Sequence, residues 1–89
     1  LHAADAVSHL ATIEQWLGRY GEKPELLETA GQVCTRNRLW GKARSYLEAV
    51  IRVAPTPAAY LALARMCSET QNPADAASYY QKGLELAAR

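Results

Sequence analysis

The chain has 89 residues, of which 49% are hydrophobic and 21% are charged, and its formal net charge is +1. This length supports one small compact domain, and the hydrophobic content argues against intrinsic disorder. No apolar run approaches the roughly 18 residues that a membrane-spanning helix needs. The near-neutral charge gives no electrostatic basis for nucleic-acid binding, and two cysteines do not make a disulfide framework.

Apolar residues recur every three or four positions in five segments, which predicts five amphipathic helices. The first helix is expected over about residues 3–20 and ends before Gly21. Its predicted inward face consists of Val7, Leu10, Ile13, Leu17 and Tyr20.

The second helix is predicted over about residues 24–37 and the third over about residues 41–54. Pro24 suits a first helical turn because its missing N–H would have no intrahelical partner there. Asn37 is expected to end the second helix in the left-handed conformation, and Pro55 stops the third. The residues predicted to face the core are Leu27, Ala30, Gly31, Val33, Cys34, Ala43, Tyr46, Leu47, Val50, Ile51 and Ala54.

The fourth and fifth helices begin with a cap residue followed by proline. Thr56 precedes Pro57 at the start of a helix over about residues 57–70, and Asn72 precedes Pro73 at the start of one over about residues 73–88. Asp75 places negative charge at the positive end of the last helix. The links are two to four residues long, so neighbouring helices are expected to be antiparallel.

Residues 24–56 repeat in residues 57–89 without a gap. The six identities are Pro24/Pro57, Cys34/Cys67, Ala43/Ala76, Ser45/Ser78, Tyr46/Tyr79 and Ala54/Ala87. A period of this length with two helices per unit is typical of a helical solenoid, which mostly binds other proteins. We therefore expect a single domain with a leading helix over residues 1–21 and repeats over 24–56 and 57–89. Because the chain starts partway through a repeat, it is expected to be part of a longer protein.

The pattern resembles the tetratricopeptide repeat (TPR). The family's signature positions hold Leu27, Ala30, Gly31, Cys34, Ala43, Leu47, Val50 and Pro55 in the first unit, and Tyr60, Leu63, Ala64, Cys67, Ala76, Tyr80, Gly83 and Ala88 in the second. The small residues Gly31, Ala64, Ala43 and Ala76 let the two helices of a hairpin approach closely. Both cysteines replace the usual aromatic residue, and Ala88 replaces the final proline. The resemblance implies an all-α fold of about five antiparallel helices, with two αα-hairpins and a leading helix in a right-handed solenoid.

A narrower resemblance covers most of the chain and is carried by residues 35–48 together with residues 13–17, with its signature around Asn37 to Leu47. These segments are similar to the C-terminal repeat region of the HemY family of bacterial proteins. Members of that family are anchored in the inner membrane by N-terminal helices and are associated with the late steps of haem biosynthesis. The resemblance implies that this domain lies on the cytoplasmic face of that membrane and that its partners include enzymes of the haem pathway.

In the TPR fold, the first helix of each hairpin lines a groove that binds an extended peptide or a partner helix. The residues expected to face this groove are Glu25, Glu28, Gln32, Thr35 and Arg36 in the first unit, and Leu61, Arg65, Ser68 and Glu69 in the second. The two arginines suit carboxylates and the three glutamates suit cations. The alternative for each of these residues is plain solvated surface.

For the remaining candidate residues, a purely structural role is compared with a binding role. Trp40 is expected to pack into the elbow of the first hairpin, with a partner-binding anchor as the alternative, and Trp16 is expected in core or cap packing. The cationic residues Arg36, Arg38, Lys42 and Arg44 form either a patch for anionic lipid headgroups or an ordinary surface, with Glu48 and Asp75 as compensating charges.

Cys34 and Cys67 are expected to be buried thiols that fill space; the alternatives are a disulfide and thiolate ligation of haem iron. His2 and His9 lie seven residues apart on one helix, so their rings cannot share a metal ion. No catalytic constellation is found, and neither an enzyme activity nor a bound cofactor is expected.

The leading hypothesis is a scaffold that binds other proteins and has no activity of its own. A haem or porphyrin carrier is the first alternative. The second alternative is self-association, with a homodimer formed through helix 73–88, because this helix ends the chain with Tyr79, Tyr80, Leu84 and Leu86 and has no further helix to cover them.

Overall fold

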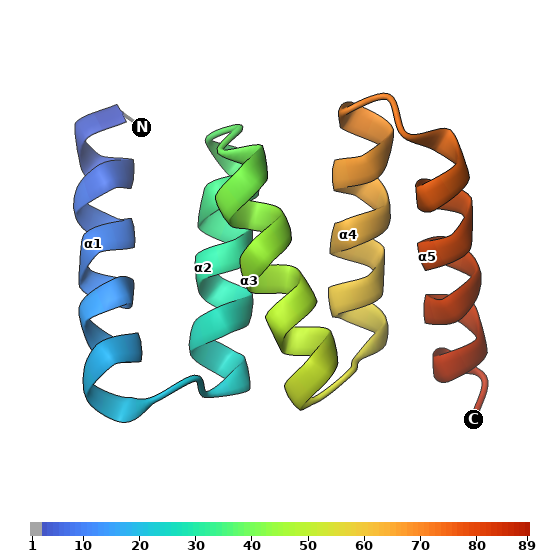
Figure 1. The fold of residues 1–89 in the computed structure, drawn as a ribbon, viewed down its shortest axis with the longest axis horizontal. Helices are drawn as coiled ribbons and strands as arrows, with labels where there is room; N and C mark the ends of the chain where they lie inside the picture. The colour runs from blue at the N-terminus through green and yellow to red at the C-terminus, as the bar shows by residue number, and fades with distance from the viewer. Residues whose placement is uncertain (1–2) are drawn as a thin grey trace.

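The structure, a computed structural model, describes the backbone of residues 3–89 and the side chains of residues 7–89. Its described part is built from five helices, α1 (Ala3–Tyr20), α2 (Pro24–Arg36), α3 (Trp40–Val53), α4 (Pro57–Glu69) and α5 (Pro73–Ala87). Successive helices run antiparallel, and Figure 1 shows them from α1 at one end to α5 at the other. The predicted all-α fold is confirmed, and each helix boundary matches its prediction to within one residue.

The helices pack as two hairpins with one leading helix. The closest packing is within the pairs α2–α3 and α4–α5, and the contact between α3 and α4 joins the two hairpins. Helix α1 packs against α2. Every predicted core residue of α2 is buried, as are Ala43, Leu47 and Val50 of α3, while Tyr46, Ile51 and Ala54 are half-buried. Ala49 of α3 is buried as well, although the pattern did not indicate it.

Two residues of the predicted inward face of α1 are exposed. Leu10 and Ile13 are buried, but Val7 is 65% exposed and Tyr20 is 54% exposed. Val7 lies roughly 120° around the helix from Ile13, given 3.6 residues per turn, and Tyr20 is the last residue before the chain turns at Gly21. Because α1 packs mainly on α2, it buries a narrower stripe than the sequence pattern suggests.

Helix α2 ends in a Schellman turn. The N–H of Leu39 donates to the carbonyl of Cys34 at 2.8 Å, and Arg38 holds the left-handed conformation with φ of 58°. The prediction that Asn37 takes this conformation is wrong, because its φ is −102°. The amide of Asn37 instead donates back to the carbonyl of Val33 at 2.8 Å.

Helix α4 ends in the same turn, one repeat later. The N–H of Asn72 donates to the carbonyl of Cys67 at 2.7 Å, and Gln71 is left-handed with φ of 60°. Asn72 makes no side-chain cap bond to α5, contrary to the prediction, and its ψ of 70° departs from the extended backbone, with ψ of 154°, of the capping residue Thr56. Thr56 does cap α4 as predicted, since its hydroxyl oxygen accepts the N–H of Ala59 at 3.1 Å.

Close approach of the two helices within a hairpin depends on glycine. A Cβ added to Gly31 would lie 2.6 Å from Cδ2 of Leu47, and one added to Gly83 would lie 3.2 Å from Cβ of Tyr60. In the first hairpin, Val50 occupies the position of Gly83. The glycine at the close approach is therefore on the first helix in one hairpin and on the second helix in the other.

Replacing Gln71 by glycine is expected to stabilise the fold. The left-handed conformation is unfavourable for a residue with a Cβ and free of this penalty for glycine. We expect Gln71→Gly to raise the free energy of unfolding by about 0.5–1 kcal/mol, measured by urea denaturation. The matched control, Ala77→Gly in exposed right-handed helix, should lower it by about 1 kcal/mol. A loss of stability in both variants would contradict the role of the turn.

Adding a side chain at Gly31 is expected to destabilise the first hairpin. Gly31→Val should lower the free energy of unfolding by about 2 kcal/mol because Leu47 is buried and cannot move aside. The double variant Gly31→Val/Leu47→Ala should lose at least about 1 kcal/mol less than the sum of the single losses. Gly18→Val is the control, since no atom lies within 4 Å of that site. Additive losses would argue against the contact.

Candidate functional site

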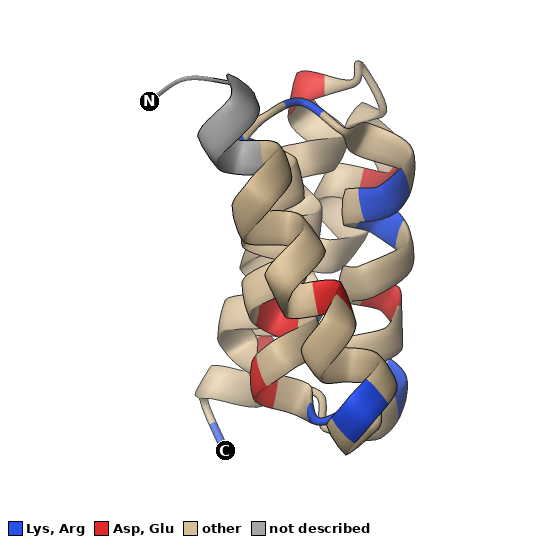
Figure 2. Ribbon diagram, turned by 90° about the vertical axis from the view of Figure 1, so that its left-hand side faces the viewer, with Lys and Arg blue, Asp and Glu red and all other residues tan. Residues whose placement is uncertain are grey.

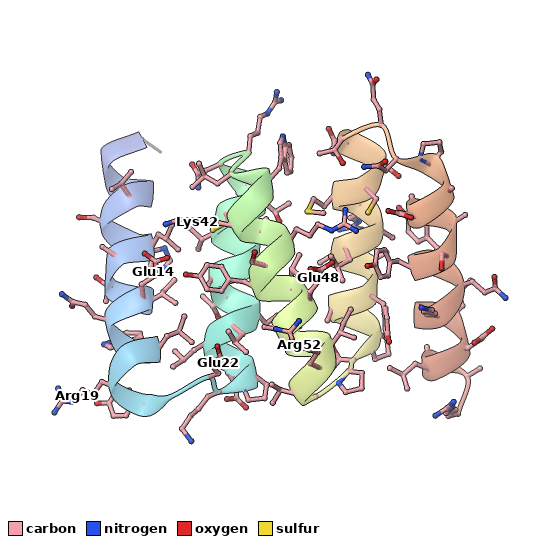
Figure 3. The ribbon with its side chains drawn as sticks, viewed as in Figure 1. Glu14, Arg19, Glu22, Lys42, Glu48 and Arg52 are labelled. Atoms are coloured by element: carbon pink, nitrogen blue, oxygen red, sulfur yellow. The ribbon has the colours of Figure 1, made fainter. Side chains whose placement is uncertain are left out.

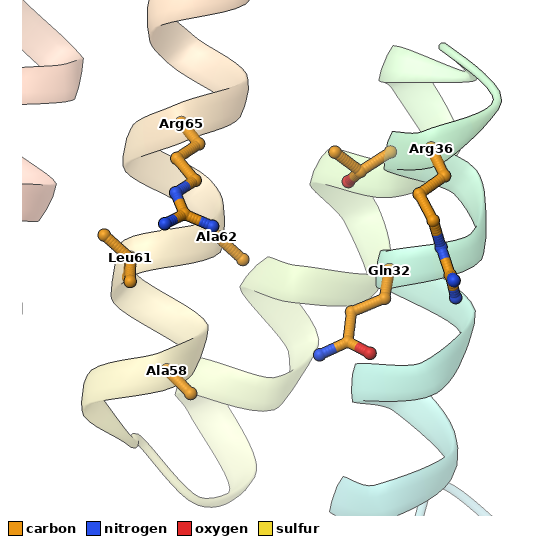
Figure 4. A pocket seen from close by; sticks show the side chains of 7 residues that line it. Gln32, Arg36, Ala58, Leu61, Ala62 and Arg65 are labelled. Carbon is orange, nitrogen blue, oxygen red and sulfur yellow. The ribbon is translucent and has the colours of Figure 1, made fainter.

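A surface hollow of about 340 Å³ lies between the first helices of the two hairpins, α2 and α4. Its lining residues are Gln32, Thr35, Arg36, Ala58, Leu61, Ala62 and Arg65. In Figure 4, Gln32 extends from α2 towards α4, and Arg65 runs along α4 beside Leu61 and Ala62. The hollow thus joins the second half of α2 to the part of α4 that ends at Arg65.

Five of the nine residues expected to face a groove line this hollow: Gln32, Thr35, Arg36, Leu61 and Arg65. The other four, Glu25, Glu28, Ser68 and Glu69, do not. The two glutamates of α2 lie before the segment that faces α4, and the other pair lies in the last turn of α4. The sequence pattern defines which side of each helix is presented, but it does not define how far α4 is shifted along α2.

Two alanines of the hollow were not singled out from the sequence. Ala58 and Ala62 share one face of α4 with Leu61 and Arg65, since the four positions follow the spacing i, i+3, i+4 and i+7. Their small side chains leave the space that a larger residue would fill. This spacing is visible in the sequence, but small residues at such positions also indicate close contact between helices, so the pattern alone does not predict a hollow.

The hollow combines an apolar floor with cationic walls. Arg36 and Arg65 are exposed, and neither forms an ion pair with any side chain of residues 7–89. Leu61 and the two alanines supply the floor. The hydroxyl of Thr35 donates to the carbonyl of Gly31 at 2.8 Å, which leaves its oxygen able to accept a further bond. This arrangement suits a ligand that has carboxylates and an aliphatic group.

Outside the hollow, Glu14 of α1 makes a polar link to two side chains of α3. Its carboxylate accepts the hydroxyl of Tyr46 and lies 3.3 Å from Nζ of Lys42; Figure 3 shows Glu14 and Lys42 facing each other between the two helices. The hydrogen bond from Tyr46, with a smaller contribution from Lys42, holds the pKa of Glu14 below its ordinary value. Burial and the nearby carboxylate raise the pKa of Tyr46.

Arg44 links α3 to α5 in a similar way. Its Nε lies 3.0 Å from Oε2 of Glu48, and its Nη2 lies 3.5 Å from Oδ2 of Asp75. The expected compensation by these two carboxylates is therefore present. Lys42 is also paired, so the four neighbouring cations do not form one positive patch, and Figure 2 shows acidic and basic residues interspersed over the side that it presents. The structure gives no support to a lipid-headgroup site there.

Both cysteines act as packing groups. Cys34 and Cys67 are free thiols with no exposed surface, as the space-filling reading predicted, and the alternative disulfide is not formed. Burial raises the pKa of both thiols above its ordinary value. A ligand outside the core cannot reach either sulfur, and the thiolate form is disfavoured. Haem ligation by these cysteines would therefore require the core to open, since neither sulfur is exposed.

The two tryptophans differ in their packing. Trp40 is half-buried against the main core cluster, in agreement with the expected elbow packing. Trp16 is about half exposed, so its predicted core or cap packing is wrong; it lies about 100° around α1 from Leu17. His9 is exposed, and His2 lies outside the described residues.

Among the side chains of residues 7–89, no group of three histidine, cysteine or acidic residues lies close enough together to hold a metal ion. No described helix is both long and apolar enough to cross a membrane.

Comparisons with known proteins were made at the levels of family, sequence and structure. No family model, curated protein or solved structure matches the chain. The features that bear on function are the hollow between α2 and α4 and the two hairpins, whose first helices end in the same turn.

Removing the hydroxyl of Tyr46 is expected to weaken the link between α1 and α3. Tyr46→Phe should lower the free energy of unfolding near pH 7 by about 1 kcal/mol. Because the pKa of Glu14 is lowered in the folded state, its contribution is present above the unfolded pKa and is lost as the pH falls through the folded value.

The difference between wild type and Tyr46→Phe should therefore narrow as the pH is lowered below 4.5, the ordinary pKa of this carboxyl. Urea denaturation between about pH 3 and pH 7 measures it. Tyr20→Phe is the control and should change nothing, because this tyrosine is exposed, its hydroxyl has no side-chain hydrogen bond among the described residues, and the variant keeps the ring that lies under Arg19. A difference that is constant with pH would contradict the link to Glu14.

Proposed function

We propose that the chain is a protein-interaction module of the TPR type, and that the hollow between α2 and α4 binds a peptide segment with carboxylates on either side of an aliphatic residue. The observation that carries this proposal is the position of Arg36 and Arg65 on opposite walls of an apolar floor that contains Leu61. Each guanidinium offers a planar fork that matches a carboxylate. The floor removes the aliphatic side chain of the ligand from water.

The composition of the hollow supports binding rather than catalysis. None of its seven lining residues is a histidine, a cysteine or a carboxylate. The only hydroxyl, that of Thr35, donates to a backbone carbonyl and has no base beside it in the lining. A nucleophile needs such a base to be activated. We therefore assign the module no activity of its own.

The walls of the hollow are helices that are already fixed by the hairpin cores. Ala30, Val33 and Cys34 hold α2, and Leu63 and Met66 hold α4, all within one buried cluster. A ligand therefore orders only a few exposed side chains when it binds. Preorganisation of this kind reduces the entropy lost on association.

The similarity of residues 35–48 to the HemY family makes enzymes of haem synthesis the first partners to test. In this proposal the module lies on the cytoplasmic face of a bacterial inner membrane and is attached through other segments of a longer protein. A haem-carrier function gains no support, because both cysteines are buried.

Binding can be tested with two synthetic peptides in which a leucine is flanked either by aspartates or by asparagines. We expect the acidic peptide to bind more tightly in fluorescence anisotropy at low salt. Arg36→Glu and Arg65→Glu should each weaken its binding by about fivefold to tenfold, because each reversal replaces an exposed attraction with a repulsion. Arg52→Glu, an equal charge change at an exposed residue outside the hollow, should leave the affinity unchanged.

Equal binding of both peptides, or an equal loss of affinity in Arg52→Glu, would contradict the proposed site.

The partner class is tested separately by crosslinking and affinity capture from cells of the source organism, with the full-length protein and an Arg36→Glu/Arg65→Glu form. Recovery of haem-synthesis enzymes by the native form alone supports the assignment. Equal recovery by both forms places the contact elsewhere, and recovery of none removes the haem link.

A further inference from the structure

A second apolar surface lies on the outer side of the hairpin α4–α5. Leu84 is 71% exposed and Tyr80 is 39% exposed, and Leu61 of α4 lies beside them. These residues surround a smaller hollow of about 150 Å³, whose remaining lining is Pro57, Gly83 and Ala87. None of the six lining residues is charged.

The equivalent surface of the first hairpin is covered by another helix. The residues 33 positions before Tyr80 and Leu84 are Leu47 and Ile51. Leu47 has no exposed surface, and Ile51 is half-buried against the core. The two hairpins have the same turns and the same order of helices, so the second hairpin exposes a face that the first one buries.

Helix α4 covers that face of the first hairpin. Leu63 and Met66 of α4 join Leu47 in the main core cluster, and Ala59 joins Val50 in the smaller one. The three α4 residues are spaced i, i+4 and i+7, which defines one apolar stripe along a helix. The equivalent face of the second hairpin therefore suits a helix with an uncharged stripe of the same spacing.

Helix α5 itself has such a stripe on its exposed side. Tyr80, Leu84 and Ala87 are spaced i, i+4 and i+7, and Pro73 and Ala77 extend the same line towards the start of the helix. All five residues are exposed. By the helical angle of about 100° per residue, the charged side chains nearest in sequence, those of Lys82 and Glu85, project to other sides of the helix.

We propose that two copies of the chain pair through α5, with the two helices antiparallel about a twofold axis. The axis passes between Tyr80 and Leu84, so that Leu84 of each copy packs on Tyr80 of the other. Each copy then supplies both the apolar face and the helix that covers it, as a twofold contact requires. This pairing uses the outer side of α5 and does not depend on peptide binding between α2 and α4.

The size of the stripe sets the expected strength of pairing. A helix of 15 residues is about 22 Å long, so a single helix pair buries less than the roughly 800 Å² per partner of a standard interface. We therefore expect a reversible dimer with a dissociation constant on the order of 100 µM.

Sedimentation equilibrium tests the pairing between about 10 µM and about 1 mM protein. The wild type should fit a monomer–dimer equilibrium. Leu84→Glu should raise the dissociation constant at least about tenfold, because it places two buried charges beside the axis. Ser78→Glu adds the same charge at an exposed position on a different side of α5 and should leave the dissociation constant unchanged. Circular dichroism verifies that both variants keep the fold.

Three results would overturn the proposal. The first is a wild type that stays monomeric to about 1 mM. If that monomer binds a synthetic peptide of residues 57–70, the apolar face of α5 binds a helix from another protein and not a second copy. The second is a mass that rises beyond two copies, since end-to-end stacking continues without closing. The third is an equal effect of Ser78→Glu and Leu84→Glu, which would place the contact off the stripe.

Discussion

Within each hairpin, two antiparallel helices approach so closely that the crossing requires a very small residue. Gly31 provides it in the first hairpin, where a Cβ would come within 2.6 Å of Leu47. The Schellman turns at Arg38 and Gln71 return the chain immediately after the preceding helix ends. Each hairpin is therefore a closely packed helix pair with two broad faces, and its neighbours pack against these faces.

The stacking of such units positions both candidate surfaces. When α4 covers the first hairpin, it comes to lie beside α2, and the hollow with Arg36 and Arg65 forms between these two helices. The same step leaves the outer face of the second hairpin exposed. Leu61 lies on α4 between the two surfaces and lines both hollows.

The burial of residues was predictable from periodicity on helices that have neighbours on both sides. It was less predictable on α1. All the inward residues predicted for α2 are buried, because α2 packs between α1 and α3. Val7, Trp16 and Tyr20 are exposed, because a helix with one main neighbour buries a narrow stripe. The starts of α2, α4 and α5 were predicted correctly, since proline at the first turn is a local signal.

The candidate site was only partly predictable, because it depends on distances between helices. Glu25, Glu28 and Gln32 are spaced i, i+3 and i+7 and so share one face of α2. Of the three, only Gln32 lies in the segment of α2 that faces α4. This offset follows from side-chain packing in the core and has no periodic signal. The bond between Tyr46 and Glu14 joins residues 32 positions apart, so no local pattern indicated it either.

The two arginines of the α2–α4 hollow differ from the paired cations of α3, and the apolar floor between them distinguishes them from the other unpaired cations of the described residues. Lys42 and Arg44 of α3 each lie against a carboxylate of a neighbouring helix. Arg36 and Arg65 have no such partner among the described side chains. Exposed ion pairs contribute at most about 1 kcal/mol to stability, so pairing these two arginines would stabilise the fold little. Left unpaired beside an apolar floor, they can attract and orient an acidic ligand, and ligand binding does not have to break an existing ion pair first.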